Sequence, residues 1–409
     1  MKGFAVPIAL AALAIPSAVN AQTIIDALVG GMPLADLRLR YENIDQSNKP
    51  QTAEAATLRA RLGYQTGSDL GLSGLVEVDL VKRLGPEHFN DSLNGLTQYP
   101  AIPDPEMVAL NRLQLAYTAR LFADPGAMPD FRLTLGRQRI QLGDQRFIGN
   151  AGWRQHEQTY DAITAAEGPF EDATFTYAYV LRVNRIFGPR SPVGTFNSHS
   201  HLLNAVYTGI PHLKLEGYAY LLDFVQAPTL STASFGVRGE SSLPAGPVTI
   251  NLNGAIARQE DYARNPLSID LGYYQVEGGA AYDGFSGAVG YEVLEGNGTI
   301  GFQTPLASLH LFQGWAESFV VNPPNGVEDL YVKANYGVPV PLIERVTASV
   351  IYHDFSAERV RASYGNEWDA RLEAQIDRRL VLDADYADFD GKGAFADKKG
   401  FWLYATWRY

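Results

Sequence analysis

Cysteine is absent from this chain of 409 residues. Its absence excludes disulfide bonds, cysteine nucleophiles and thioredoxin-type redox chemistry. Histidine is also scarce, with 7 residues, and no pair of histidines has metal-ligand spacing together with a carboxylate partner. We therefore expect no cofactor and no metal site, and a structure held together by backbone hydrogen bonds and packing.

Long apolar runs are missing as well, except near the N-terminus. There Lys2 precedes an apolar run from Phe4 to Ile15, and Val19-Asn20-Ala21 forms a small-residue cleavage site before Gln22. This pattern predicts a signal peptide over residues 1–21, so we expect the chain to be exported. Beyond it, no stretch approaches the roughly 18 consecutive apolar residues that a membrane-spanning helix needs.

Positive charge is in deficit, because 33 Lys and Arg residues face 45 Asp and Glu residues, a net charge of -12. A duplex-binding protein needs a basic face to displace counterions, so nucleic acid is not an expected partner. Charged residues make up only 19% of the chain, whereas 39 Gly, 22 Tyr and 19 Phe are present. This composition favours one large sheet structure over two or three soluble domains.

What the sequence does contain is a series of segments of about ten residues in which apolar and polar residues alternate. In the first, Leu37, Leu39 and Tyr41 share one face and Arg38 and Arg40 the other. Strands of about nine to eleven residues have the length that a tilted strand needs to cross hydrocarbon, with one face toward lipid and the other toward water. Further segments of this form are TLRARLGYQ, LSGLVEVDL, RLQLAYTARL, ATFTYAYVLRV and EWDARLEAQID.

The connections between these segments alternate in length, as the turns and loops of a transmembrane barrel do. They predict a single antiparallel barrel over residues 22–409 with about 18 strands and both termini on the short-turn side. The count is open by about two strands, because 259–272 and 299–315 are ambiguous. The short connections are 65–69, 123–130, 243–247, 282–285, 338–344 and 377–379, and the long ones are 45–56, 82–108, 142–158, 186–198, 224–231, 295–325, 355–366 and 390–399.

The chain ends in an alternating strand over residues 400–409, and the first strand is expected near residue 34. Pairing of these two strands would remove both sheet edges, whose unpaired backbone groups cannot face lipid. The aromatic last residue, Tyr409, resembles the C-terminal signal that outer-membrane barrels present to the barrel assembly machinery. We therefore predict a monomer in the outer membrane of a Gram-negative cell, in contact with outer-membrane lipid. Tyrosines and tryptophans near strand ends fit interfacial girdles, although aromatic residues also favour strands in general.

The densest group of arginine, glutamine, glycine and aromatic residues lies between Arg132 and Ala162. It begins as a strand with Leu133 and Leu135 on its apolar face, and the alternation fails after Gln141. The loop 142–158 that follows carries Phe147, Ile148 and Trp153, which a solvated loop would not need. We therefore expect this loop to pack against protein, folded into a lumen.

With these segments placed, the central stretch resembles the signature of the alginate export family of outer-membrane proteins. The matching motif residues are Gly136, Arg137, Gln138, Arg146, Phe147, Ile148, Gly149, Asn150, Gly152, Trp153, Arg154, Gln155, Gln158, Tyr160 and Asp161. Residues 305–332 also resemble the late extracellular loop of that family. The resemblance implies an eighteen-stranded barrel whose narrowed, arginine-rich lumen passes anionic polysaccharide or its fragments. The lumen here also carries Glu77, Asp79, Asp369, Glu373, Asp383 and Asp385, so the charge of the solute stays open.

Arginines of the polar strand faces are the candidate constriction residues, because a guanidinium is a permanently charged fork suited to carboxylates and sugar hydroxyls. They either orient an anionic solute or pair with carboxylates on neighbouring strands to neutralise a water-filled interior. Arg137 and Arg139 fall on the apolar side of their strand's register, so this strand is expected to bulge or leave the membrane there. The candidates are Arg38, Arg40, Arg59, Arg61, Arg112, Arg120, Arg132, Arg137, Arg139, Arg146, Arg154 and Arg182, with Glu77, Asp79, Asp369 and Glu373.

We predict a passive porin for anionic or polar carbohydrate; the alternative is a general or small-solute porin without a polysaccharide role. An outer-membrane enzyme is less favoured, because His199-Ser200-His201 lacks a locatable orienting carboxylate, and Glu167 or the Asp383/Asp385 pair would be needed as glycosidase carboxylates. A calcium loop at 295–298 reads better as a turn. The segment 22–33 is too short for a plug domain, and a soluble β-protein remains a further alternative.

Overall fold

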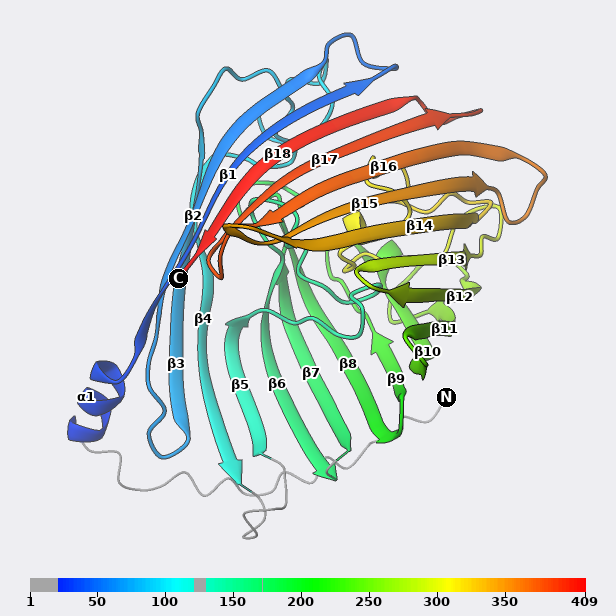
Figure 1. Cartoon of the computed structure of the whole chain (residues 1–409). Helices are drawn as coiled ribbons and strands as arrows, with labels where there is room; N and C mark the ends of the chain where they lie inside the picture. Colours follow the sequence, from blue (N-terminus) through cyan, green and yellow to red (C-terminus); the bar gives the residue numbers. More distant parts are fainter. Residues whose placement is uncertain (1–20, 121–129, 171) are drawn as a thin grey trace.

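The computed structural model describes residues 21–120, 130–170 and 172–409, which form one antiparallel sheet of 18 strands and little helix. The strands follow one another around the sheet in chain order (Figure 1). The elements are α1 Ala21–Val29, β1 Met32–Gln46, β2 Ala53–Gln65, β3 Leu72–Arg83, β4 Met107–Arg120, β5 Asp130–Gln138, β6 Thr159–Phe170, β7 Ala173–Asn184, β8 Thr195–Ile210, β9 Leu213–Leu221, η1 Pro228–Leu230, β10 Thr232–Ala245, β11 Val248–Asp261, β12 Asp270–Tyr282, β13 Phe285–Leu294, η2 Leu309–Leu311, β14 Val327–Val340, β15 Ile343–Ser356, β16 Ser363–Gln375, β17 Leu380–Gly391 and β18 Lys398–Arg408.

The sheet closes because β1 pairs with both β2 and β18 (Figure 1). In the closing pair, Leu37 lies opposite Trp407 and Tyr41 opposite Leu403. Closure gives every strand two neighbours, so no row of backbone donors and acceptors is left at an edge. The predicted closed barrel of about 18 strands is confirmed.

The pleat places apolar side chains outside and polar side chains inside, as the alternation predicts. On β1, the Leu39 side chain is 51% exposed while Arg40 is 1% exposed. On β16, Trp368 is 53% exposed and its neighbour Asp369 is fully buried. The lumen is therefore enclosed by charged residues, and its filling by protein explains why they are buried.

Several strands are longer than the nine to eleven residues expected, with β1 spanning 15 residues and β8 spanning 16. Outward-facing ion pairs lie near the ends that connect to long loops, including Arg258 with Asp270 and Lys399 with Asp388. Such pairs are costly in hydrocarbon and inexpensive in the polar interface. The extra length is therefore strand that extends beyond the hydrocarbon into the polar region.

Short turns gather at one end of the barrel and long loops at the other. The region 295–326 is one long connection that contains only η2, so the ambiguous stretch 299–315 is not a strand. The ambiguous stretch 259–272 comprises the end of β11, a loop and the start of β12. Most of the predicted turn 123–130 and nearly all of the predicted signal peptide 1–21 lie outside the described residues. None of the described helices is long and apolar enough to cross a membrane.

Two groups of buried apolar side chains lie inside the barrel where long loops turn inward. One joins Phe302 and Phe319 of the connection 295–326 to Phe355 and Phe389 of the wall. The other joins Ile148 of the loop 139–158 to Val180 and Leu202. These apolar contacts on an otherwise polar inner wall show where the loops are packed, and they position the site.

Candidate functional site

The loop 139–158 leaves β5 at a backbone position that only glycine adopts easily. Gly136 has φ +110, and a Cβ there would clash with the carbonyl of Leu113 on β4. Farther along, Gly149 donates from its backbone to the Leu306 carbonyl at 2.8 Å, which joins this loop to the connection 295–326. The loop therefore turns inward and meets a second inward loop, as expected for a segment packed into the lumen.

Arginines of β1 and β2 hold the loop by its backbone. Arg38 donates to the carbonyls of Gly152 and Trp153 at 3.1 and 3.0 Å, and Arg40 donates to the Trp153 carbonyl at 2.6 Å. The Arg40 guanidinium also lies 4.1 Å from the Trp153 ring centroid. Arg61 donates to the Gln155 carbonyl at 2.9 Å. These guanidinium groups donate hydrogen bonds to loop carbonyls that are buried away from solvent.

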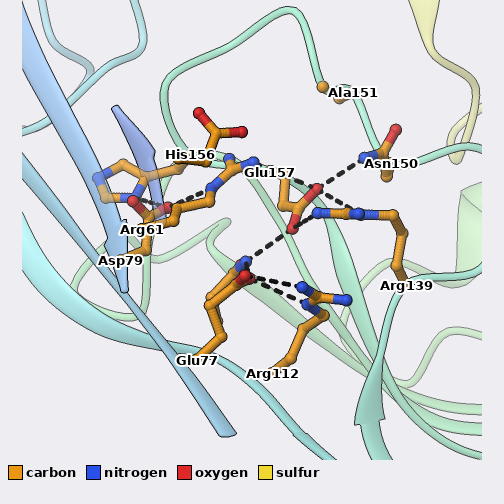
Figure 2. Close-up of polar contacts among 12 residues, drawn as sticks. Arg61, Glu77, Asp79, Arg112, Arg139, Asn150, Ala151, His156 and Glu157 are labelled. Atoms are coloured by element: carbon orange, nitrogen blue, oxygen red, sulfur yellow. Dashed lines mark hydrogen bonds and ion pairs between the residues drawn. The ribbon is translucent and has the colours of Figure 1, made fainter. Parts of the chain in front are cut away.

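A fully enclosed carboxylate, Glu157, is the centre of the charge network beneath the loop (Figure 2). Arg139 donates to both of its oxygens at 2.6 and 2.8 Å, Asn150 at 2.6 Å and Asn111 at 2.7 Å. Arg61 lies 3.5 Å away. Burial alone would raise the pKa of Glu157, but Arg61 and Arg139 lower it to about 2. The carboxylate stays ionised and joins the loop to β2 and β4.

The carboxylates of β3 complete this network. Glu77 accepts two hydrogen bonds from Arg112 at 2.7 and 2.9 Å, and Asp79 lies 3.2 Å from Nδ1 of His156. The other ring nitrogen of His156 lies 2.9 Å from the carbonyl of Pro105 in the long β3–β4 connection. Figure 2 shows these groups converging from the wall and the loop. The expected pairing of arginines with carboxylates on neighbouring strands is present here.

The connection 295–326 packs against the first loop through an aromatic stack. The His310 ring lies parallel to the Trp153 ring, with centroids 3.5 Å apart. Glu317 pairs with Arg154 and lies 3.3 Å from His310. Burial lowers the pKa of His310 to about 4, so it is neutral at pH 7. The loop 139–158 and the connection 295–326 therefore form one loop unit across the lumen.

The wall holds this second loop through carboxylates of β16. Glu367 accepts the backbone N–H of Ala316 at 2.6 Å, and Asp369 accepts that of Trp315 at 3.3 Å. A buried carboxylate that accepts backbone donors fixes both the charge and the loop. Asp369, a predicted constriction residue, thus supports the loop that narrows the lumen.

On the opposite side, Arg146 and Phe147 attach the first loop to β9–β13. Arg146 donates to Glu292 of β13 at 2.7 Å. Burial alone would lower the pKa of Arg146, but the negative charge of Glu292 raises it. The Phe147 ring lies 5.2 Å from Tyr218 and 5.3 Å from Tyr273. Edge and tilted ring contacts of this kind add to the burial energy. The loop therefore spans the lumen from wall to wall.

The glutamines of the motif bind backbone carbonyls and one side chain of the wall. The Gln158 amide donates to the carbonyls of Gly149 and Leu306 at 2.9 and 3.1 Å, and the Gln155 amide donates to Thr57 at 2.8 Å. Gln138 donates to the Ala162 carbonyl at 2.9 Å. Gln138 and Gln158 therefore satisfy backbone carbonyls, and Gln155 joins the loop to the Thr57 side chain of β2.

Other predicted residues lie in the lumen away from this unit. Arg59 pairs with Asp36 on β1, and Arg132 is exposed near the short-turn end, with Nη1 3.5 Å from the Thr118 hydroxyl. Glu373 lies on β16 opposite Asp383 of β17, and Asp385 accepts from Arg371 at 2.6 Å. The side chain of Arg120 lies outside the described part of the chain.

Two predicted constriction residues, Arg182 and Arg137, lie on the outer wall instead of in the lumen, as does the motif residue Asp161. A register shift in β7 between Val180 and Arg182 leaves Arg182 exposed and buries Val183, so the expected lumen orientation of Arg182 is wrong. Arg137 keeps the outward register of its strand and donates to Asp161 at 2.7 Å. The bulge reverses the alternation locally, which strict periodicity cannot anticipate.

The residues considered for catalysis are also dispersed. His199 and His201 face outward on β8, where each is within hydrogen-bond distance of a tyrosine hydroxyl on β7, at 3.1 and 2.9 Å. The Ser200 hydroxyl lies 2.6 Å from that of Ser198 on the inner face. Glu167 lies on β6, far around the wall from Asp383 on β17. The backbone of Gly272 donates to Glu295, whose segment was considered for calcium.

Several residues of the loop unit were missed by the sequence reasoning. Glu157 lies in the loop between named motif residues, and a carboxylate surrounded by arginines in a packed loop is a signal that could have identified it. His310 and Glu317 carry no local signal, because their partners are more than 150 positions away in the chain. Glu292 is likewise recognised only through its contact with Arg146.

Above the loop unit, on the long-loop side, lies a cavity of about 650 Å³. Its lining combines amides, aromatic side chains and cations, a mixture suited to polar ligands. The lining includes Gln141, Gln145, Asn150, Gln158, Trp153, Arg154 and Arg185.

The region of the chain that contains the loop 139–158 is similar to a known protein family. Residues 76–187, which contain it, match the family model described as Alginate export. The resemblance to the alginate export family is confirmed. OccAB4 of Acinetobacter baumannii has the same fold, with a TM-score of 0.72, 15% identity, and 94% of this chain and 99% of that chain covered. OpdQ of Pseudomonas aeruginosa also has this fold, with a TM-score of 0.69 and 13% identity. The alignment covers 94% of this chain and 99% of OpdQ. Curated proteins gave no match.

The alginate export family match and the closed barrel together support an outer-membrane channel. The matched residues begin on β3 and end just beyond β7, so they include Glu77, Asp79 and the whole loop 139–158. The part of the chain that matches the family therefore contains one of the two loops that fill the lumen.

Proposed function

We propose that this chain is a passive outer-membrane channel for polar carbohydrate, of the alginate type or smaller. The observation that carries the proposal is the loop 139–158, which spans a polar lumen, is held by buried charges, and lies within the alginate export family match. Solute size and hydrogen bonding at this constriction decide what passes.

The cavity above the constriction supports a saccharide as the solute. Its volume, about 650 Å³, lies within the usual range for small-molecule sites. Gln141 donates to Gln145 and Asn150, each at 3.1 Å, and this cluster of amides lines the cavity, where it can exchange hydrogen bonds with hydroxyl groups.

A second candidate, a general porin for small polar solutes, is favoured by one specific observation. Arg38, Arg40 and Arg61 donate to the loop, so their forks are already occupied. An anionic polysaccharide would have to compete with these contacts. Small neutral solutes make no such demand on the arginines.

Reconstituted protein tests the two candidates. Vesicles containing the channel should swell in neutral disaccharides and in short uronate oligomers faster than in inert sugars of larger size. Swelling with amino acids and ions but none with any saccharide would favour the general porin. Vesicles that behave like protein-free vesicles with every solute would overturn the channel itself.

A further inference from the structure

Below the loop unit lie two further cavities that share part of their lining. The central one has a volume of about 290 Å³, and the other, near the short-turn end, about 790 Å³. Asn253, Glu277 and Lys333 line both. The shared lining makes the two cavities neighbours along the inner wall of β10–β15.

The central cavity also meets the cavity above the loop unit, at a single shared residue. Leu311, at the end of η2, lines both. Its side chain is 58% exposed although it belongs to an inward loop, so it projects into open space instead of packing. The three cavities therefore follow one another from the long-loop side to the short-turn side, with Leu311 at the partition.

We propose that solute crosses the barrel along the inner wall of β10–β15 through these three cavities, and that the Leu311 side chain sets the size limit. The inference rests on the proposed channel function. In this proposal the arginines of β1 and β2 hold the loop 139–158. The solute passes on the other side of the lumen, along β10–β15.

The backbone around Leu311 is held independently of its side chain. Phe312 lies with its ring 4.8 Å from the Arg146 guanidinium, and Trp315 donates its backbone N–H to Asp369. A change at Leu311 therefore alters the opening without releasing the loop. This separation makes the residue suitable for a size test.

The charge of the central cavity points to the class of solute. Lys333 pairs with Glu277 at 2.6 Å, Arg238 pairs with Asp144, and His353 lies 2.9 Å from Asp329. Four carboxylates, including Glu292, and two permanent cations, Arg238 and Lys333, line this cavity. Arg146 neutralises Glu292 from outside the lining, which leaves one carboxylate in excess over the permanent cations. A narrow passage with this balance favours neutral and cationic solutes over anions. We therefore expect neutral saccharides to cross more readily than uronates.

The first experiment measures single-channel conductance of Leu311→Ala and Leu311→Trp. The alanine variant should conduct more, by about 1.5-fold or above, and the tryptophan variant less than about half as much. Leu84→Ala is the matched control, because Leu84 is 54% exposed in another long loop and lines none of these three cavities. Conductance that is the same in both Leu311 variants as in the unmodified protein would overturn the partition.

The second experiment uses the absence of cysteine. A bulky, water-soluble thiol reagent should lower the conductance of Asn253→Cys and leave Asn48→Cys, in the exposed β1–β2 loop, unchanged. Block of neither variant would place the passage elsewhere.

Reversal potentials in a KCl gradient should show cation preference, and anion preference would refute the charge argument. Absence of conductance in the unmodified protein would instead refute the proposed function, so the two failures are distinguishable.

Discussion

Individual buried charges hold the constriction in place. Glu157 illustrates the balance, because a carboxylate with no exposed side-chain surface is costly unless donors surround it. Here four side chains supply the donors or the positive charge, and they come from β2, from β4, and from the start and the middle of the loop. Removing the charge leaves the cations of Arg61 and Arg139 without their common partner.

We expect Glu157→Gln to loosen the loop 139–158 by roughly 3 kcal/mol, as for other buried pairs that lose one partner. Hydrogen exchange of the backbone amides of residues 149–158 measures this change. Glu106→Gln is the matched control, because Glu106 pairs with Lys82 at the surface, where such pairs contribute about 1 kcal/mol or less. Equal effects of the two substitutions would contradict the role of Glu157.

His310 gives the contact between the two loops a pH dependence. Its pKa is lowered to about 4, so the unfolded segment binds a proton at higher pH than the packed one. The contact is therefore fully stable above about pH 6.5 and loses stability as pH falls from there toward 4. Open-channel fluctuations recorded from pH 7 to 4 should increase across this range.

The variant His310→Phe separates this effect from packing. It keeps an aromatic ring against Trp153 and removes the titrating group. We expect its fluctuations to stay flat between pH 6.5 and 4, where the histidine protein changes. An unaltered pH profile in the phenylalanine variant would assign the dependence to another group.

At the scale of elements, one strand end decides where the loop begins. Gly136 sits on β5 with a positive φ and in close contact with the β4 backbone. Any side chain there meets both backbone strain and a steric clash. The direction in which the chain enters the lumen therefore depends on this glycine.

Gly136→Ala should destabilise the end of β5 by about 1–3 kcal/mol. The folded barrel should unfold at a lower temperature in detergent, as followed by the loss of its compact form on electrophoresis. Gly217→Ala on β9 is the control, because a Cβ at Gly217 meets no atom within 4 Å. A midpoint unchanged by Gly136→Ala, or lowered equally by both, would show that the left-handed backbone is not required.

At the scale of the whole molecule, closure of the sheet into a barrel and filling of its lumen by loops are separate properties. The wall is held by ladders between neighbouring strands, including β1 with β18. The filling comes from two loops that attach to that wall through side chains. The barrel should therefore survive loss of a loop, while the size of its opening changes.

Replacing residues 142–156 by a short Gly-Ser linker should raise single-channel conductance by about two-fold or more, because the segment spans the lumen. Circular dichroism should show the same strand content as the unmodified protein. A linker of equal composition in the exposed region 47–52 serves as control. Unchanged conductance after removal of the central loop would show that solute does not pass the constriction.

The sequence by itself determined the wall, because alternation along each strand records which side chains meet lipid and which meet water. Leu39 beside Arg40 and Trp368 beside Asp369 are enough to assign the two faces, and the lengths of the connections order the strands. The same reasoning located the inward loop, because Phe147, Ile148 and Trp153 would be out of place in solvent. Period-two reasoning failed at Arg182, where a bulge changes the register without a signal in the residue types.

Only the tertiary structure decided what the lumen residues do. Arg40 pairs with a loop more than a hundred positions away, and His310 meets Trp153 across a similar span. No local pattern encodes such contacts, because they depend on where closure of the sheet places each strand. The same arginine could face a solute or a loop carbonyl, and the folding of two loops into the lumen determines which.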